Sequence, residues 1–193
     1  MMDAHRTRRQ SKTCTLHSTT ILSVRKDGTV AIGGDGQVSL GETTVKQDAS
    51  KLRSFQDGRI WCGFAGAAAD GFALLDRLGA KLDEHKNNLR RAAIELAKDW
   101  RADRVLRRLN SLIVVVNDEA TLMISGGGDV IEPTDGVIGV GSGGMYAVAA
   151  ARALLAESKL GAPQIVEKSL HIAADICVYT NNNITVETVR QQS

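Results

Sequence analysis

The sequence predicts an α+β protein of four layers, an αββα sandwich in which two antiparallel sheets pack between two pairs of helices. Strand patterns follow one another directly in two places, which favours antiparallel sheets over the alternating units of a doubly wound fold. Long helices occur in pairs after each strand group, and each pair must cover the apolar face of a sheet. No linker or low-complexity tract breaks this order, so one domain over residues 19–193 is expected after a leader, residues 1–18.

The first half of the chain is predicted to hold about four strands and then two helices. Lys26-Asp27-Gly28 is a hairpin signal between two apolar runs, and Asp35-Gly36-Gln37 then interrupts the pattern. The extended segments cover residues 20–25, 29–34, 43–47, 51–55 and 59–65. Apolar residues at helical spacing predict helices over residues 67–86 and 89–109. Their buried faces comprise Phe72, Leu75, Leu78 and Leu82 in the first helix, and Ala92, Leu96, Trp100, Val105 and Leu109 in the second.

The second half repeats the order of strands and then helices. An Ala-rich helix is expected over residues 145–157, and Pro163 starts a helix that runs to about Val178. A last extended piece, residues 184–189, closes the pattern. The strands before the helices cover residues 112–116, 122–125, 129–131 and 137–140.

The charge is distributed unevenly along the chain. The formal net charge is +2, but residues 1–18 carry four basic side chains against Asp3, a charge of +3, which leaves −1 for the rest. A near-neutral body gives no electrostatic reason to expect nucleic acid as a partner. No apolar run reaches the length of a membrane span, so no membrane partner is expected either.

The three cysteines, Cys14, Cys62 and Cys177, have no paired spacing. This favours a reducing compartment and argues against a disulfide framework or a cysteine zinc site. The leader has no hydrophobic core of a secretory signal, and we interpret it as a pro-segment that is removed. A cytoplasmic location is expected, with the mitochondrial matrix as the alternative for a eukaryotic source, because the leader is rich in Arg.

Thr19 stands at the start of the first strong strand pattern. A threonine hydroxyl is a weak nucleophile unless a base lies beside it, and a freed Thr19 would carry its own α-amine as that base. The plain structural alternative is a β-favouring residue that begins a strand.

Three further residues favour the catalytic interpretation. Lys51, a lone cation between apolar neighbours, could stabilise charge, or it could be a surface lysine. Asp35 could hold that lysine or the new N-terminus, or it could be a turn aspartate. Gly63 lies near a strand end, where its N–H could donate to an oxyanion.

The segment Gly139–Gly144 follows a strand, opens a helix and fits the pattern G-x-G-x-x-G. That context would suit a dinucleotide, which leaves a nucleotide-binding enzyme as a rival hypothesis. The unit lacks a partner strand of adequate length, so Ser142 is better interpreted as a polar residue that reaches into a site from a tight turn. The histidines show no ligand spacing, and no zinc is predicted.

Several specific blocks occur in a fixed order from Thr19 to the C-terminal region. They are Thr19-Thr-Ile-Leu-Ser-Val, Gly34-Asp-Gly-Gln-Val, Lys51-Leu-Arg, Gly63-Phe-Ala-Gly, Ala97-Lys-Asp-Trp-Arg, Gly141-Ser-Gly-Gly and Asp175-Ile-Cys-Val-Tyr-Thr. In order and spacing they resemble the HslV (ClpQ) peptidase family, which is proteasome-β-like. The resemblance implies an N-terminal nucleophile hydrolase that forms two stacked hexameric rings, a dodecamer, around a closed chamber. It also implies a hexameric ATPase partner, HslU (ClpY), which feeds in unfolded proteins and alone uses ATP.

The resemblance also assigns roles to residues. Thr19 would be the nucleophile, Lys51 and Asp35 would tune it, Ser142 would support the N-terminus, and Gly63 would donate to the oxyanion. No cofactor is implied for the chemistry. A structural sodium ion would bind the backbone carbonyls of Ala174, Cys177 and Thr180. A second rival hypothesis is a catalytically silent ring subunit that keeps its leader.

The chain departs from the family pattern at four points. Its leader is longer than is usual for bacterial members, and Ser18 precedes the nucleophile. Ala174 and Met145 stand where many members have Gly and Pro. The implied sodium ligand at position 174 is a backbone carbonyl, so alanine in place of glycine keeps it.

Overall fold

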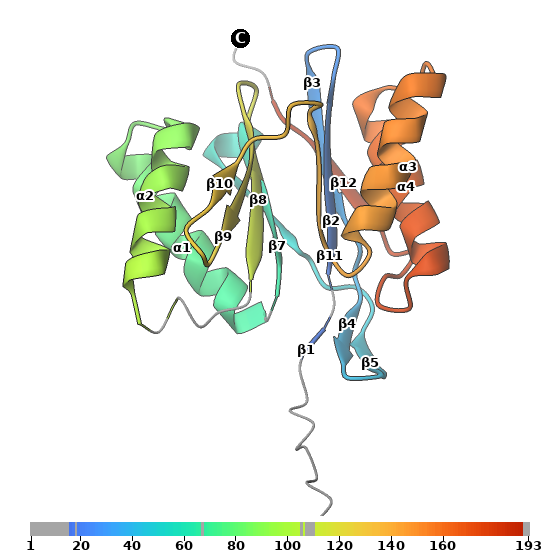
Figure 1. The fold of residues 1–193 in the computed structure, drawn as a ribbon, viewed down its shortest axis with the longest axis horizontal. Helices are drawn as coiled ribbons and strands as arrows, with labels where there is room; N and C mark the ends of the chain where they lie inside the picture. Colours follow the sequence, from blue (N-terminus) through green and yellow to red (C-terminus); the bar gives the residue numbers. More distant parts are fainter. Residues whose placement is uncertain (1–15, 18, 67, 105, 107–110, 191–193) are drawn as a thin grey trace, which may run out of the picture.

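The computed structural model describes residues 16–17, 19–66, 68–104, 106 and 111–190. It has the predicted four-layer αββα architecture, with two antiparallel sheets face to face and a pair of helices on each outer side (Figure 1). The predicted buried positions Val105 and Leu109 lie outside the described residues.

The four-stranded sheet contains the strand that directly follows Thr19. Its order is β11-β2-β3-β12, and every pairing is antiparallel. The hairpin between β2 and β3 turns at Asp27 and Gly28, both with positive φ, as the sequence predicted. The strands are β2 (Thr20–Lys26), β3 (Thr29–Gly34), β11 (Val137–Gly141) and β12 (Thr185–Thr188).

The five-stranded sheet has the order β10-β9-β8-β7-β6. It comprises β6 (Leu52–Phe55), β7 (Ile60–Ala65), β8 (Leu112–Val116), β9 (Thr121–Ser125) and β10 (Val130–Ile131). The two halves of the chain therefore do not form one sheet each. Strands β6 and β7 from the first half join the second half, while β11 and β12 return to the β2–β3 hairpin.

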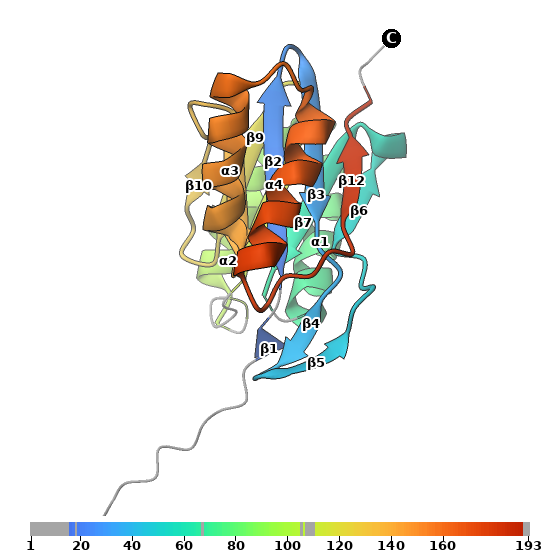
Figure 2. The same cartoon turned by 90° about the vertical axis from the view of Figure 1, so that its right-hand side faces the viewer.

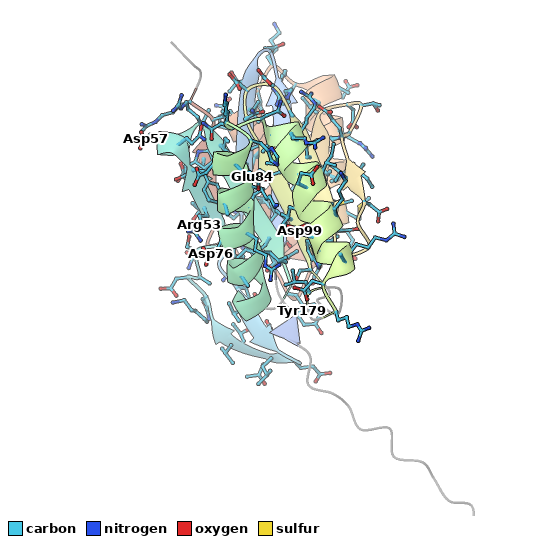
Figure 3. All side chains as sticks on the ribbon, turned by 90° about the vertical axis from the view of Figure 1, so that its left-hand side faces the viewer. Arg53, Asp57, Asp76, Glu84, Asp99 and Tyr179 are labelled. Atoms are coloured by element: carbon cyan, nitrogen blue, oxygen red, sulfur yellow. The ribbon has the colours of Figure 1, made fainter. Side chains whose placement is uncertain are left out.

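Helices α1 (Ala68–Glu84) and α2 (Leu89–Ala102) cover the five-stranded sheet, and α3 (Gly144–Glu157) and α4 (Ala162–Ile176) cover the other (Figures 1 and 2). Three apolar clusters fill the spaces between the four layers, and the central one includes Ile21 and Val114. Asn88 caps α2, as expected, through a bond from Arg91 N–H to its side chain. Figure 3 shows the α1–α2 face, where Arg53 of β6 lies beside Asp76 of α1.

Two sequence predictions need correction. Helix α2 ends at Ala102 instead of continuing to Leu109, because Asp103 adopts an extended backbone (φ −76°, ψ 122°) and accepts a hydrogen bond from Leu106 N–H at 3.2 Å. A small sheet, β1-β4-β5, was also missed in part. It pairs β1 (Leu16–His17) with β4 (Val38–Leu40), and β4 with β5 (Thr43–Lys46), and it projects beyond the sandwich (Figure 2).

The helices of the described residues do not meet the requirements of a membrane span. None of them is both long enough and apolar enough to cross a bilayer.

Candidate active site

The centre of the site is the carboxylate of Asp35, which follows β3 and is almost fully buried. Its Oδ1 accepts a hydrogen bond from Lys51 Nζ at 2.7 Å and another from Thr20 N–H at 2.8 Å. Its Oδ2 accepts from the backbone N–H groups of Gln37 at 2.9 Å and Asn181 at 3.3 Å. One cation and three backbone donors therefore fix this carboxylate in a single orientation.

The β2–β3 hairpin explains why Asp35 lies beside Thr20. The pairing of Ile21 with Gly34 places the residues just outside this pair opposite each other, and Asp35 N–H donates to Thr20 C=O at 3.2 Å. Lys51 precedes β6 of the other sheet, and its Cβ lies 3.8 Å from where a Cβ on Gly34 would stand. The ion pair therefore joins the ends of two sheets.

Lys51 is buried, and this burial changes the pKa of its ammonium group. Burial lowers the pKa of its ammonium below the ordinary value, and the attraction and hydrogen bond of Asp35 oppose that shift. The prediction that Lys51 points inward onto Asp35 agrees with this geometry, and the surface-lysine alternative does not.

Thr19 is buried and lies directly before β2. Its carbonyl oxygen accepts a hydrogen bond from Ser142 N–H at 3.1 Å. Gly141, with φ of +90°, passes so close that a Cβ there would stand 1.7 Å from the same oxygen. The turn after β11 therefore holds the main chain of Thr19 from one side, while Asp35 holds Thr20 from the other.

Ser142 belongs to the site through its backbone, and its side chain is exposed. The glycines around it serve close packing. A Cβ on Gly139 would stand 2.6 Å from Gly144 O, and Gly143 N–H donates to Thr20 Oγ1 at 2.9 Å. This use of the turn argues against the dinucleotide interpretation.

Gly63 lies within β7, paired with Leu52 of β6 and Val114 of β8. A Cβ on it would stand 2.9 Å from side-chain atoms of Ile21, so glycine allows β2 and β7 to approach across the central core. Its neighbour Leu52 directly follows Lys51, which brings Gly63 near the site. Its role as an oxyanion donor stays a prediction.

The three predicted sodium ligands lie in the last turn of α4 and in the loop that follows it. Ala174 is in the last turn of the helix, where carbonyl groups have no partner within the helix. Cys177 follows as the cap, and its carbonyl oxygen accepts from Thr180 N–H at 2.9 Å, which leaves it a second lone pair. Backbone oxygens at the negative end of a helix are a donor set that suits a cation. Among the described residues no cluster of three or more His, Cys, Asp or Glu side chains could hold a metal ion.

The sequence did not predict Thr20 or Asn181 as site residues, and it predicted Thr180 only as a backbone ligand of sodium. The Thr20 and Thr180 hydroxyl oxygens lie 2.7 Å apart, and Asn181 donates to Asp35 from the loop after α4. The Thr-Thr pair at the start of the strand was the only local signal for Thr20. Thr180 is distant in sequence, and its place depends on where α4 ends.

Comparison with known proteins identifies the family. The proteasome subunit family matches residues 15–189 of the chain. Eukaryotic HslV from Trypanosoma brucei superposes with a TM-score of 0.85 at 48% identity, over 89% of this chain and 99% of that chain. Thiobacillus denitrificans BPH, solved in complex with epoxomicin, superposes with a TM-score of 0.73 at 20% identity, over 90% of this chain and 100% of that chain, a likeness that concerns the fold alone. The chain therefore belongs to the proteasome subunit family, as an HslV-type threonine protease of the N-terminal nucleophile class that works as a ring-forming oligomer.

Proposed function

We propose that this chain is the endopeptidase subunit of an ATP-dependent protease and that Thr19 is its nucleophile once the bond to Ser18 is cut. The observation that carries the proposal is the buried Asp35–Lys51 pair, bonded directly to the residue after Thr19. In such an arrangement a cation, a fixed carboxylate and a new N-terminus meet at one end of the sandwich.

The reaction begins when the freed α-amine of Thr19 takes the proton of the Thr19 hydroxyl. The oxygen attacks the substrate carbonyl carbon, and the resulting oxyanion is stabilised by donors such as Gly63 N–H. The ammonium then gives its proton to the leaving amine as the C–N bond breaks, which leaves an ester on Thr19. Water, deprotonated by the same amine, hydrolyses the ester and restores the hydroxyl.

Lys51 and Asp35 act as a unit in this scheme. The ammonium of Lys51 is a buried positive charge that favours the neutral α-amine and the developing negative charge on oxygen. Asp35 fixes Lys51 in place and, through Thr20 N–H, the start of β2. Ser142 supports the N-terminus from the other side.

Residues 1–18 are proposed to be a pro-segment. Leu16 and His17 pair with Leu40 and Ser39 of β4, so the end of the leader adds a strand beside the site. Cleavage before Thr19 would release this strand and expose the amine.

The similarity to HslV supports the rest of the assembly. We propose a dodecamer of two hexameric rings that receives unfolded proteins from an HslU-type ATPase, which alone uses ATP. The proposed location is the cytoplasm, or the mitochondrial matrix in a eukaryotic source. A sodium ion on the carbonyls of Ala174, Cys177 and Thr180 would brace the end of α4, and replacing sodium with choline in the buffer should then lower the thermal unfolding midpoint.

The test of the nucleophile is Thr19→Ala. Peptide hydrolysis should fall to background while the ring assembles as before, seen by gel filtration. Thr188→Ala, at an exposed position of β12, is the matched control and should keep full activity. Retained hydrolysis in Thr19→Ala would rule out the assignment.

Intact mass of the assembled protein completes the test. The measured mass should be that of a chain that begins at Thr19. A silent ring subunit would keep its leader, and fully active material with position 19 still joined to Ser18 would contradict the mechanism.

A further inference from the structure

We propose that Thr20 and Thr180 are positioning residues of the active site, a buried pair of hydroxyl groups that holds the turn Gly141–Gly144 against the start of β2. The inference rests on the proposed function, because the position of this turn matters to turnover only if Thr19 reacts.

Three chain segments meet at one oxygen atom. Thr20 Oγ1 lies 2.7 Å from Thr180 Oγ1 and accepts a hydrogen bond from Gly143 N–H at 2.9 Å. Both threonines are buried, with exposed fractions of 0% for Thr20 and 4% for Thr180. A hydroxyl offers one donor and two acceptor sites, so a single Thr20 side chain can satisfy both neighbours.

The backbone of Thr20 is fixed as firmly as its side chain. Its N–H donates to Asp35 Oδ1 at 2.8 Å, and its carbonyl oxygen accepts from Asp35 N–H at 3.2 Å. Thr20 thus connects the Asp35 carboxylate on one side to the Gly141–Gly144 turn on the other. The adjacent residue of that turn, Ser142, donates to the carbonyl of Thr19. A shift of the turn would therefore reach the nucleophile directly.

The loop that carries Thr180 also reaches Asp35. Asn181 N–H donates to Asp35 Oδ2, and Gly36 N–H donates to Asn181 Oδ1 at 3.1 Å. Two positions before Thr180, Val178 O accepts a hydrogen bond from Gln37 Nε2 at 2.9 Å. This loop lies at the same end of the sheet as the start of β2 (Figure 2). It therefore contacts both the Asp35 carboxylate and the strand that follows the nucleophile.

The fit leaves no room for another group between the segments. A Cβ on Gly143 would stand 2.5 Å from both Thr20 Oγ1 and Thr180 Oγ1. Replacing Thr20 with valine preserves the shape but leaves Gly143 N–H and the Thr180 hydroxyl buried without this partner. Serine keeps the oxygen, so it should keep the connection.

The experiment measures kcat and KM for a fluorogenic peptide on the full chain, with rates normalised to the fraction that begins at Thr19 by intact mass. Thr20→Val and Thr180→Val should each lower kcat by about 10- to 100-fold with KM within about twofold, because small displacements of reacting groups have effects of this size. Thr20→Ser and Thr180→Ser should restore kcat to within about threefold. The double valine variant should be no slower than the slower single variant, since the two hydroxyls act as one unit.

The matched control is Ser23→Ala. Ser23 lies on the same strand, is fully buried, and donates to Ala31 O of β3 at 3.0 Å, a contact that does not involve the turn. Its kcat should stay at the wild-type value. If Thr20→Val does not fold, Thr180→Val tests the same contact from a different segment.

Three results would overturn the inference: wild-type kcat in Thr180→Val, a rise in KM with unchanged kcat, or an equal fall of kcat in Ser23→Ala. Thr19→Ala separates this failure from that of the proposed function. An inactive Thr19→Ala with a fully active Thr180→Val would refute the positioning pair alone, whereas an active Thr19→Ala would refute the nucleophile.

Discussion

Lys51 Nζ and Asp35 Oδ1 lie 2.7 Å apart, with side chains that are 4% and 0% exposed. The surface ion pair Lys46–Asp48, at 3.2 Å, is by contrast more than half exposed on both sides. A buried pair is poor evidence for stability, because desolvation offsets much of the attraction. Its value here is a fixed positive charge beside the start of β2.

Lys51→Met should lower kcat by about 100-fold, because it removes a charge from a site where negative charge develops on oxygen. Asp35 keeps its three backbone donors, so the fold should survive, which circular dichroism can check. Lys46→Met removes a lysine from an exposed pair and should retain wild-type kcat. An unchanged rate in Lys51→Met would remove Lys51 from the mechanism.

The pH dependence of stability offers an independent test of the burial of Lys51. Burial lowers the pKa of Lys51 below 10.5 despite the opposing effect of Asp35. Just below pH 10.5 the unfolded chain holds a proton that the folded chain has released, so the free energy of unfolding rises with pH in that window. The free energy of unfolding, measured with urea, should therefore rise toward pH 10.5 in the wild type relative to Lys51→Met. A difference that shrinks would mean that the pKa is raised instead.

Gly141→Ala tests the turn over Thr19. Its φ of +90° disfavours any side chain, and the new Cβ would collide with Thr19 O at 1.7 Å. We expect a stability loss of about 1–3 kcal/mol from backbone strain and a fall of kcat of about 100-fold from displacement of Thr19. Gly161→Ala is the control, since a Cβ there meets Pro163 Cδ at an ordinary 3.8 Å. Equal kcat values for the two variants would contradict the tight approach.

Much of the fold follows from local patterns. The β2–β3 hairpin was predictable because Asp27 and Gly28 supply the positive φ values its turn needs. The exchange of strands between the halves was not, because pairing β11 with β2 depends on contacts more than a hundred residues apart. The end of α2 was missed for a similar reason. Trp100 continues the apolar spacing, but its Nε1 donates to Leu106 O at 2.9 Å, a bond made by a chain that has left the helix.

The residues of the site also fall into those that the sequence predicted and those that it did not. Asp35 and Lys51 stood out because a charge in an apolar or glycine-rich setting needs a reason. Thr20 and Thr180 did not, because a threonine in a strand or loop is ordinary until the fold brings the two hydroxyls together. Ser142 was predicted for its side chain, whereas the structure uses its backbone N–H.

Cys62 should be inert in the folded protein. Burial raises the pKa of its thiol from 9.0 to about 12, with Arg53 opposing the shift, so the reactive thiolate is absent at neutral pH. Iodoacetamide at about pH 8 should leave Cys62 unmodified in the native chain and alkylate it in guanidinium chloride, as read by peptide mass spectrometry. Between pH 9.0 and about 12 the unfolded chain loses a proton that the folded chain keeps, so the free energy of unfolding should fall with pH relative to Cys62→Ala. Rapid native alkylation would show that β7 opens to solvent, and with it the strand that carries Gly63.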